Sequence, residues 1–104
     1  MAARSIQSLK ETVASAVRSY NEQTIPERRI ERVSLFGSYA EGRPTESSDV
    51  DLLVKFASPA VSLLCLGRVL ETFEESLRMP VDLVQDPLPD DSLLDIGAKV
   101  VLYG

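Results

Sequence analysis

The sequence contains no histidine and no tryptophan, and it contains only one cysteine. The absence of histidine excludes Ser-His-Asp triads, Cys-His nucleophiles and the common zinc sites. A single cysteine permits no intramolecular disulfide, and the apolar run 62–66 around Cys65 indicates a small core residue rather than a reactive thiol. Acid-base or metal chemistry must therefore come from carboxylates, and we expect a reducing, cytoplasmic compartment.

Basic residues are also few, because 11 Lys and Arg against 16 Asp and Glu give a formal net charge of −5. We therefore expect no direct nucleic-acid partner, and we expect any bound phosphate to arrive with a metal. No apolar run is long enough to cross a bilayer, and the first residues lack the apolar core of a secretory signal. The 104 residues, 44% of them hydrophobic, predict one domain over 1–104 and no membrane association.

Apolar residues at helical spacing predict two helices. The first covers 3–22, with a stripe formed by Ile6, Leu9, Val13, Val17 and Tyr20. The second covers about 59–78, with Ser58 as the N-cap and Pro59 at the first helical position. Its predicted core stripe is Val61, Leu64, Cys65, Val69, Phe73 and Leu77.

Strands are predicted between and after these helices, over 32–36, 49–56 and 81–84. The strand over 49–56 is apolar enough for a central position in a sheet. The tail adds a helical piece over 91–99 and a short strand or packed segment over 100–103. This alternation predicts an α/β (α+β) fold, a small mixed sheet flanked by helices.

Three aspartates mark the predicted strands. Asp49 and Asp51 are two positions apart, so on a strand both carboxylates face the same way, roughly 7 Å apart, and can share a cation. The alternative for this pair is an acidic turn that leads into a strand. Asp82 lies in the 81–84 strand. It is either a third acid beside the pair or an isolated acid that sits at an edge or pairs with an arginine.

Gly37 and Ser38 directly follow the 32–36 strand. If a helical turn begins there, its free backbone N–H groups form an anion site that suits a phosphate. The alternative is an ordinary turn between a strand and a loop. Tyr39 is expected to pack on this turn, with contact to a nucleotide base or an acceptor as the other interpretation.

The combination of Gly37-Ser38, a ten-residue spacer, Asp49-x-Asp51 and a distal Asp82 resembles the nucleotidyltransferase superfamily that includes DNA polymerase beta. The stretches 35–42, 48–54, 80–84 and 101–104 look especially like the minimal nucleotidyltransferase (MNT) proteins, so the resemblance covers nearly the whole chain. It implies the nucleotidyltransferase fold.

The resemblance also implies a function. Asp49, Asp51 and Asp82 would hold two Mg²⁺ ions, which suits their oxygen ligands. Gly37 and Ser38 would hold the β- and γ-phosphates of ATP. MNT proteins commonly pair with a HEPN protein, an all-helical ribonuclease toxin, and some transfer AMP to a tyrosine of that partner as antitoxins. A homodimer or a hetero-oligomer in a prokaryotic cytoplasm would fit this role.

Glu41 departs from the MNT pattern, because many relatives carry arginine at that place in Gly-Ser-x-Ala-Arg-Gly. Arg43 could supply a cation from a different position. The reversed charge motivates a second hypothesis, a catalytically weakened antitoxin or complex subunit that neutralises a HEPN ribonuclease by covering it. A third hypothesis is a subunit that adenylylates small molecules such as aminoglycosides, for which the sequence offers no recognisable acceptor pocket.

Overall fold

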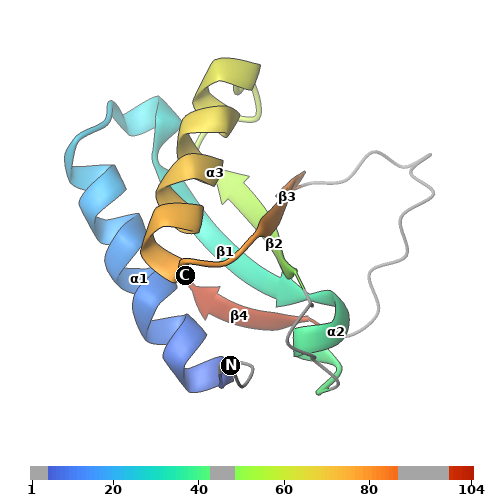
Figure 1. The fold of residues 1–104 in the computed structure, drawn as a ribbon. Coiled ribbons are helices and arrows are strands. Elements are labelled where there is room, and N and C mark those ends of the chain that lie inside the picture. Colours follow the sequence, from blue (N-terminus) through green and yellow to red (C-terminus); the bar gives the residue numbers. More distant parts are fainter. Residues whose placement is uncertain (1–4, 43–48, 87–98) are drawn as a thin grey trace, which may run out of the picture.

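A four-stranded sheet with two long helices on one face forms the described part of the chain (Figure 1). The computed structural model describes residues 5–42, 49–86 and 99–104. The elements in chain order are α1 (Ile6–Glu22), the 3-10 turn η1 (Pro26–Arg28), β1 (Ile30–Phe36), α2 (Gly37–Ala40), β2 (Val50–Phe56), α3 (Leu63–Leu77), β3 (Val81–Asp86) and β4 (Val100–Tyr103). None of the helices in these ranges has the length and apolar character needed to cross a membrane.

The sheet has the strand order β3-β2-β1-β4 and mixes both orientations. β1 is antiparallel to β2 and to β4, whereas β2 and β3 are parallel. A parallel pair needs a crossover connection, and α3 supplies it. The predicted mixed sheet and the central position of the strand that follows Asp49 are both confirmed.

The hydrophobic core lies between the sheet and the two long helices. Its fully buried side chains come from one stripe of each helix and from alternate positions of the central strands. They include Leu9, Val13, Val17, Val33, Leu35, Leu52, Val54, Val69 and Phe73. Full burial of such a side chain contributes about 1.5–3 kcal/mol, so this layer holds the helices on the sheet.

The alternation of side chains along β2 and β3 directs two aspartates away from this core. Val50 and Leu52 belong to the core cluster, so Asp51 between them projects from the opposite face. On β3, Val81 is buried in the cluster, which places the next residue, Asp82, on that opposite face as well. The sheet therefore separates the two long helices, α1 and α3, from these carboxylates.

α3 begins later than the sequence predicts. Ser62 is its N-cap rather than Ser58, and the Ser62 hydroxyl accepts a hydrogen bond from the Cys65 N–H at 3.1 Å. The buried residues of α3 are then four apart: Cys65, Val69, Phe73 and Leu77. The prediction of Leu64 as a core residue is wrong, because the position before Cys65 lies about 100° around the helix axis. Leu64 is 72% exposed, and the preceding Leu63 is 86% exposed.

The remaining predictions differ from the structure at element ends. β1 and β3 are each two residues longer than predicted, while β4 coincides with the predicted 100–103 segment. Ile6, predicted on the buried stripe of α1, is 36% exposed at the first position of that helix. The helix predicted over 91–99 falls outside the described residues except for Lys99, which lies before β4.

Candidate active site

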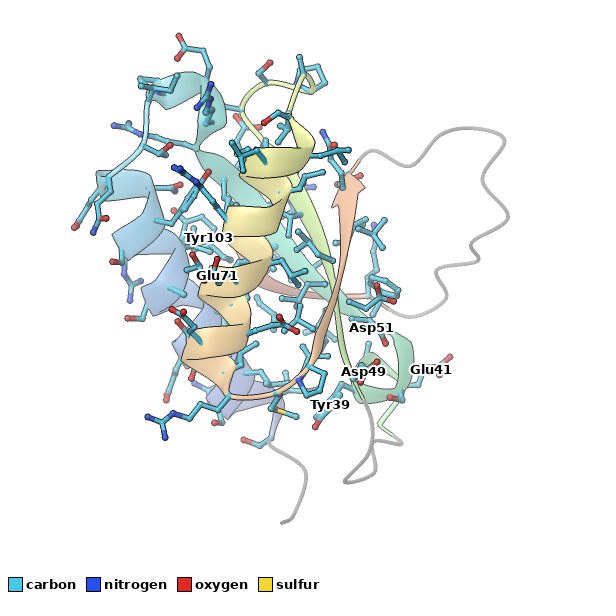
Figure 2. The ribbon with its side chains drawn as sticks, turned by 45° about the horizontal axis from the view of Figure 1, so that its top comes forward. Tyr39, Glu41, Asp49, Asp51, Glu71 and Tyr103 are labelled. Carbon is cyan, nitrogen blue, oxygen red and sulfur yellow. The ribbon has the colours of Figure 1, made fainter. Side chains whose placement is uncertain are left out.

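Two of the three predicted acids face each other across neighbouring strands. Asp51 of β2 and Asp82 of β3 are register partners in the parallel pair. Partners in adjacent strands project from the same face of a sheet, so the structure brings these two carboxylates together. Asp49 lies directly before β2, two positions from Asp51 and exposed. Figure 2 shows Asp49 and Asp51 at the end of the sheet beside α2.

The surroundings of Asp51 alter the ionisation of its carboxyl group. Burial raises the pKa of Asp51 above its usual value of 3.8, and the negative charges of Asp82 and then Asp49 raise it further. Neighbouring negative charges disfavour the ionised form of the Asp51 carboxyl group. The site therefore carries a repulsion that a bound cation would relieve.

Oxygen-only donors of this kind suit a hard divalent cation such as Mg²⁺. The residues fit such an ion in chemistry and in their convergence on one face. In their present arrangement, however, no three acidic, histidine or cysteine side chains within 5–42, 49–86 and 99–104 are grouped closely enough to hold a metal ion. The acids that would bind an ion are therefore neighbours, but they do not form a closed ligand set.

Gly37 makes the close approach of α2 to this site feasible. Its φ angle is +73°, a left-handed conformation that glycine adopts without steric cost. A Cβ atom at this position would overlap with Oδ2 of Asp51. Phe36, the residue before Gly37, is the register partner of Asp51 in the antiparallel pair β1–β2. The glycine thus lets the chain turn directly against the carboxylate.

The predicted helical turn after β1 is present as α2, which begins at Gly37 and includes the half-buried Ser38. The first N–H groups of a helical turn have no partner within the turn, so they are available to an anion. Tyr39 packs in the core at 2% exposure, which confirms the packing interpretation. Its hydroxyl finds no hydrogen-bond partner among the described residues. Glu41 is exposed at the end of α2 (Figure 2), and Arg43 lies outside the described residues.

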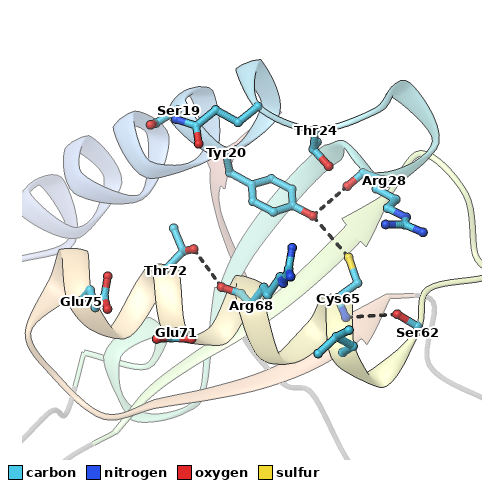
Figure 3. A pocket seen from close by; sticks show the side chains of 12 residues that line it. Ser19, Tyr20, Thr24, Arg28, Ser62, Cys65, Arg68, Glu71, Thr72 and Glu75 are labelled. Carbon is cyan, nitrogen blue, oxygen red and sulfur yellow. Dashed lines mark hydrogen bonds between the residues drawn. The ribbon is translucent and has the colours of Figure 1, made fainter.

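A separate groove that the sequence did not predict lies between α1 and α3 (Figure 3). It encloses about 490 Å³ and has Tyr20 and Cys65 among its lining residues. The Tyr20 hydroxyl donates to the Arg28 carbonyl at 3.2 Å and lies 3.3 Å from the Cys65 sulfur. Burial, and then the contact with Cys65, raise the pKa of Tyr20 to about 12. The groove opens on the helix side of the sheet, so it is distinct from the aspartates.

A comparison with protein families identifies the family of this chain. Residues 20–96 match the family model of the polymerase beta nucleotidyltransferases. The chain belongs to this family. The match contains Gly37, Ser38 and all three aspartates, so the nucleotidyltransferase motif predicted from the sequence lies inside the matched region.

Two curated relatives of this nucleotidyltransferase come from archaea. A *Methanocaldococcus jannaschii* protein that carries the name of a protein adenylyltransferase is 38% identical over 76 residues, which cover 69% of this chain and 81% of the relative. The protein adenylyltransferase MntA of *Thermococcus cleftensis* is 34% identical over 93 residues, which cover 89% of this chain and 93% of the relative. The similarity to MntA thus extends over nearly the full length of both chains.

The nucleotidyltransferase also resembles a solved structure. A chain from the complex of the tri-AMPylated *Shewanella oneidensis* HEPN toxin with its MNT antitoxin matches with a TM-score of 0.65 and 21% identity. The match covers 95% of this chain and 72% of the other. At this identity the comparison establishes a shared fold, and it confirms the nucleotidyltransferase fold predicted from the sequence.

Proposed function

We propose that this nucleotidyltransferase transfers AMP from ATP to a tyrosine hydroxyl of a HEPN-type toxin and thereby acts as its antitoxin. The observation that carries the proposal is the in-register pair Asp51 and Asp82, with Asp49 beside it, on a chain of the nucleotidyltransferase family. The similarity to protein adenylyltransferases supports AMP as the transferred group. The fold shared with a complex of an MNT antitoxin and an AMPylated HEPN toxin supports the partner.

The transfer requires an in-line displacement at the α-phosphorus of ATP. A bond forms between the tyrosine oxygen and the α-phosphorus, the bond from that phosphorus to the bridging oxygen breaks, and pyrophosphate leaves. Asp82, exposed on the edge strand β3, would take the tyrosine proton. The N–H groups of the first turn of α2, at Gly37 and Ser38, would donate to the β- and γ-phosphates.

Asp49, Asp51 and Asp82 would hold two Mg²⁺ ions in this reaction. When bound, such ions neutralise the phosphate charge and stabilise the attacking and leaving oxygens. The raised pKa of Asp51 supports this assignment, because a carboxylate under repulsion from two others gains from a cation. Addition of AMP to the toxin adds negative charge and bulk beside a surface that must bind RNA phosphates, which explains the antitoxin effect.

The test combines the protein with ATP labelled at the α-phosphate, Mg²⁺ and the HEPN protein encoded beside it. We expect label on the HEPN protein, lost with EDTA and reduced at least a hundredfold by Asp51→Asn or Asp82→Asn. Asp86→Asn is the matched control, because Asp86 lies four positions beyond Asp82 on the same strand, opposite Lys55. Unchanged labelling in the Asp51→Asn and Asp82→Asn variants would refute the roles assigned to these residues.

A second candidate function is a binding antitoxin with weak or absent chemistry. It is favoured by the acidic Glu41 at the end of α2, where the MNT pattern has arginine. The same experiment separates the two functions. A binding antitoxin would form a stable complex with the HEPN protein and inhibit its ribonuclease activity without transferring label.

A further inference from the structure

Glu74 makes two hydrogen bonds where α3 ends and β3 begins, one through its backbone and one through its side chain. Its backbone carbonyl accepts a bond from the Arg78 N–H at 2.8 Å, which ends the helix. Its side-chain Oε2 accepts a bond from the Val81 N–H at 3.1 Å, at the first residue of β3. Glu74 thus connects the last turns of α3 to the start of the strand that carries Asp82.

The same turn is also bonded to β2. The Val50 N–H donates to the Pro80 carbonyl at 3.0 Å. Val50 directly precedes Asp51, and Val81, which follows Pro80, directly precedes Asp82. The bond from Val81 to Glu74 therefore lies one residue before Asp82, and the bond from Val50 to Pro80 lies one residue before Asp51. A change in the path of residues 80–81 would move Asp82 relative to Asp51.

β3 is an edge strand, because the sheet order is β3-β2-β1-β4. An edge strand has a neighbour on one side only, so part of its backbone has no strand to bond with. The Glu74 carboxylate serves as the acceptor for the first N–H of β3. Without this bond, the first N–H of β3 would lose its side-chain acceptor, and the start of β3 would depend on its pairing with β2 and on the packing of Val81 in the core.

We propose that Glu74 is a positioning residue of the active site, which holds Asp82 in register with Asp51 through the Val81 N–H. The inference rests on the proposed function, since it assigns to Glu74 the placement of one of the acids that bind the cation. Glu74 itself lies on α3, and its bond reaches the backbone before Asp82 rather than the carboxylate. It acts on the geometry of the site and not on the reacting atoms.

The test compares Glu74→Ala, Glu74→Gln and Glu75→Ala. Glutamine retains a side-chain oxygen that can accept the Val81 N–H, whereas alanine does not. Glu75 is the matched control, because it is the next residue of α3 and is also exposed. Two readouts apply: amide hydrogen exchange at Val81 and Asp82 in the metal-free protein, and the dissociation constant of Mn²⁺ in the presence of ATP, measured by calorimetric titration.

We expect Glu74→Ala to speed exchange at Val81 about fivefold and to raise the Mn²⁺ dissociation constant by a similar factor, as the loss of one hydrogen bond predicts. Glu74→Gln should recover most of both effects, and Glu75→Ala should match the wild type. Faster exchange with unchanged Mn²⁺ affinity would reduce Glu74 to a structural role and overturn the proposal, as would no change in either readout.

The failure of the proposed function would give a different result. If the wild-type protein itself bound no Mn²⁺ with ATP and transferred no label, the function of the site would be wrong, whatever the variants did. If the wild type bound and transferred normally and Glu74→Ala did the same, only the role of Glu74 would be wrong.

Discussion

Gly37 and Asp51 lie so close together that the backbone of the first leaves no room for a side chain beside the carboxylate of the second. The contact joins the beginning of α2 to the strand that carries the acid. Two independent reasons favour glycine at position 37. Its φ angle is positive, and a side chain there would overlap with the Asp51 carboxylate.

Gly37→Ala is therefore expected to destabilise the protein by at least about 1–2 kcal/mol, the cost of a left-handed conformation in a residue with a Cβ. It should also displace Asp51. Gly67→Ala is the control, because a Cβ at this position of α3 meets nothing. That variant should stabilise the helix by about 0.5–1 kcal/mol. Denaturant unfolding measures both, and equal effects of the two substitutions would contradict this account.

The raised pKa of Asp51 predicts a pH dependence of stability. The folded protein binds the Asp51 proton more tightly than the unfolded chain does, so the associated stability is present below pH 3.8 and is lost as the pH rises through the raised value. Asp51→Asn should then increase the Tm of the metal-free protein at pH 7 and lose this advantage at a pH below 3.8. Melting curves in EDTA test the prediction, which fails if the difference in Tm does not vary with pH.

Tyr39→Phe should increase stability. The Tyr39 hydroxyl is buried and has no hydrogen-bond partner among the described residues, so it loses its interaction with water on folding without replacement. Removal of this oxygen should raise the free energy of unfolding by about 1 kcal/mol. A lower free energy of unfolding in Tyr39→Phe would show that the hydroxyl has a partner in solution.

Arg78 ends α3 in the left-handed conformation, with φ of 55°, and is the sole non-glycine residue with positive φ in the described part of the chain. Arg78→Gly should stabilise the protein by about 0.5–1 kcal/mol because glycine adopts this conformation without strain. Arg29→Gly is the control, since Arg29 has φ of −68° and gains nothing from the substitution. Chemical denaturation of both variants should shift the midpoint in opposite directions.

Local patterns were sufficient to predict most of the elements. The mainly apolar run after Asp49 predicted β2, and the strand predicted over 81–84 begins where β3 begins. These signals depend on residues close together in the chain, which physical rules of helix and strand formation describe well. The start of α3 was predicted wrongly because two serines, Ser58 and Ser62, both resemble N-caps.

The choice between these serines depends on contacts across the fold. A start at Leu63 directs Cys65 inward, where its sulfur lies 3.3 Å from the Tyr20 hydroxyl of α1. Local sequence patterns cannot predict that contact, because it joins residues 45 positions apart. The same limit applies to the candidate site. The acids could be singled out, but the register of Asp51 with Asp82 and the bond from Val81 to Glu74 arise only when β2, β3 and α3 assemble.

The two faces of the sheet carry different parts of the molecule, the core on one and the aspartates on the other. The helices and the apolar layer that hold the fold lie on one face, while the aspartates project from the other. Neutral replacements at Asp51 or Asp82 should therefore yield well-folded but chemically silent proteins. Under the proposed function, such variants would bind the partner without modifying it, and co-purification with them from cells would identify that partner.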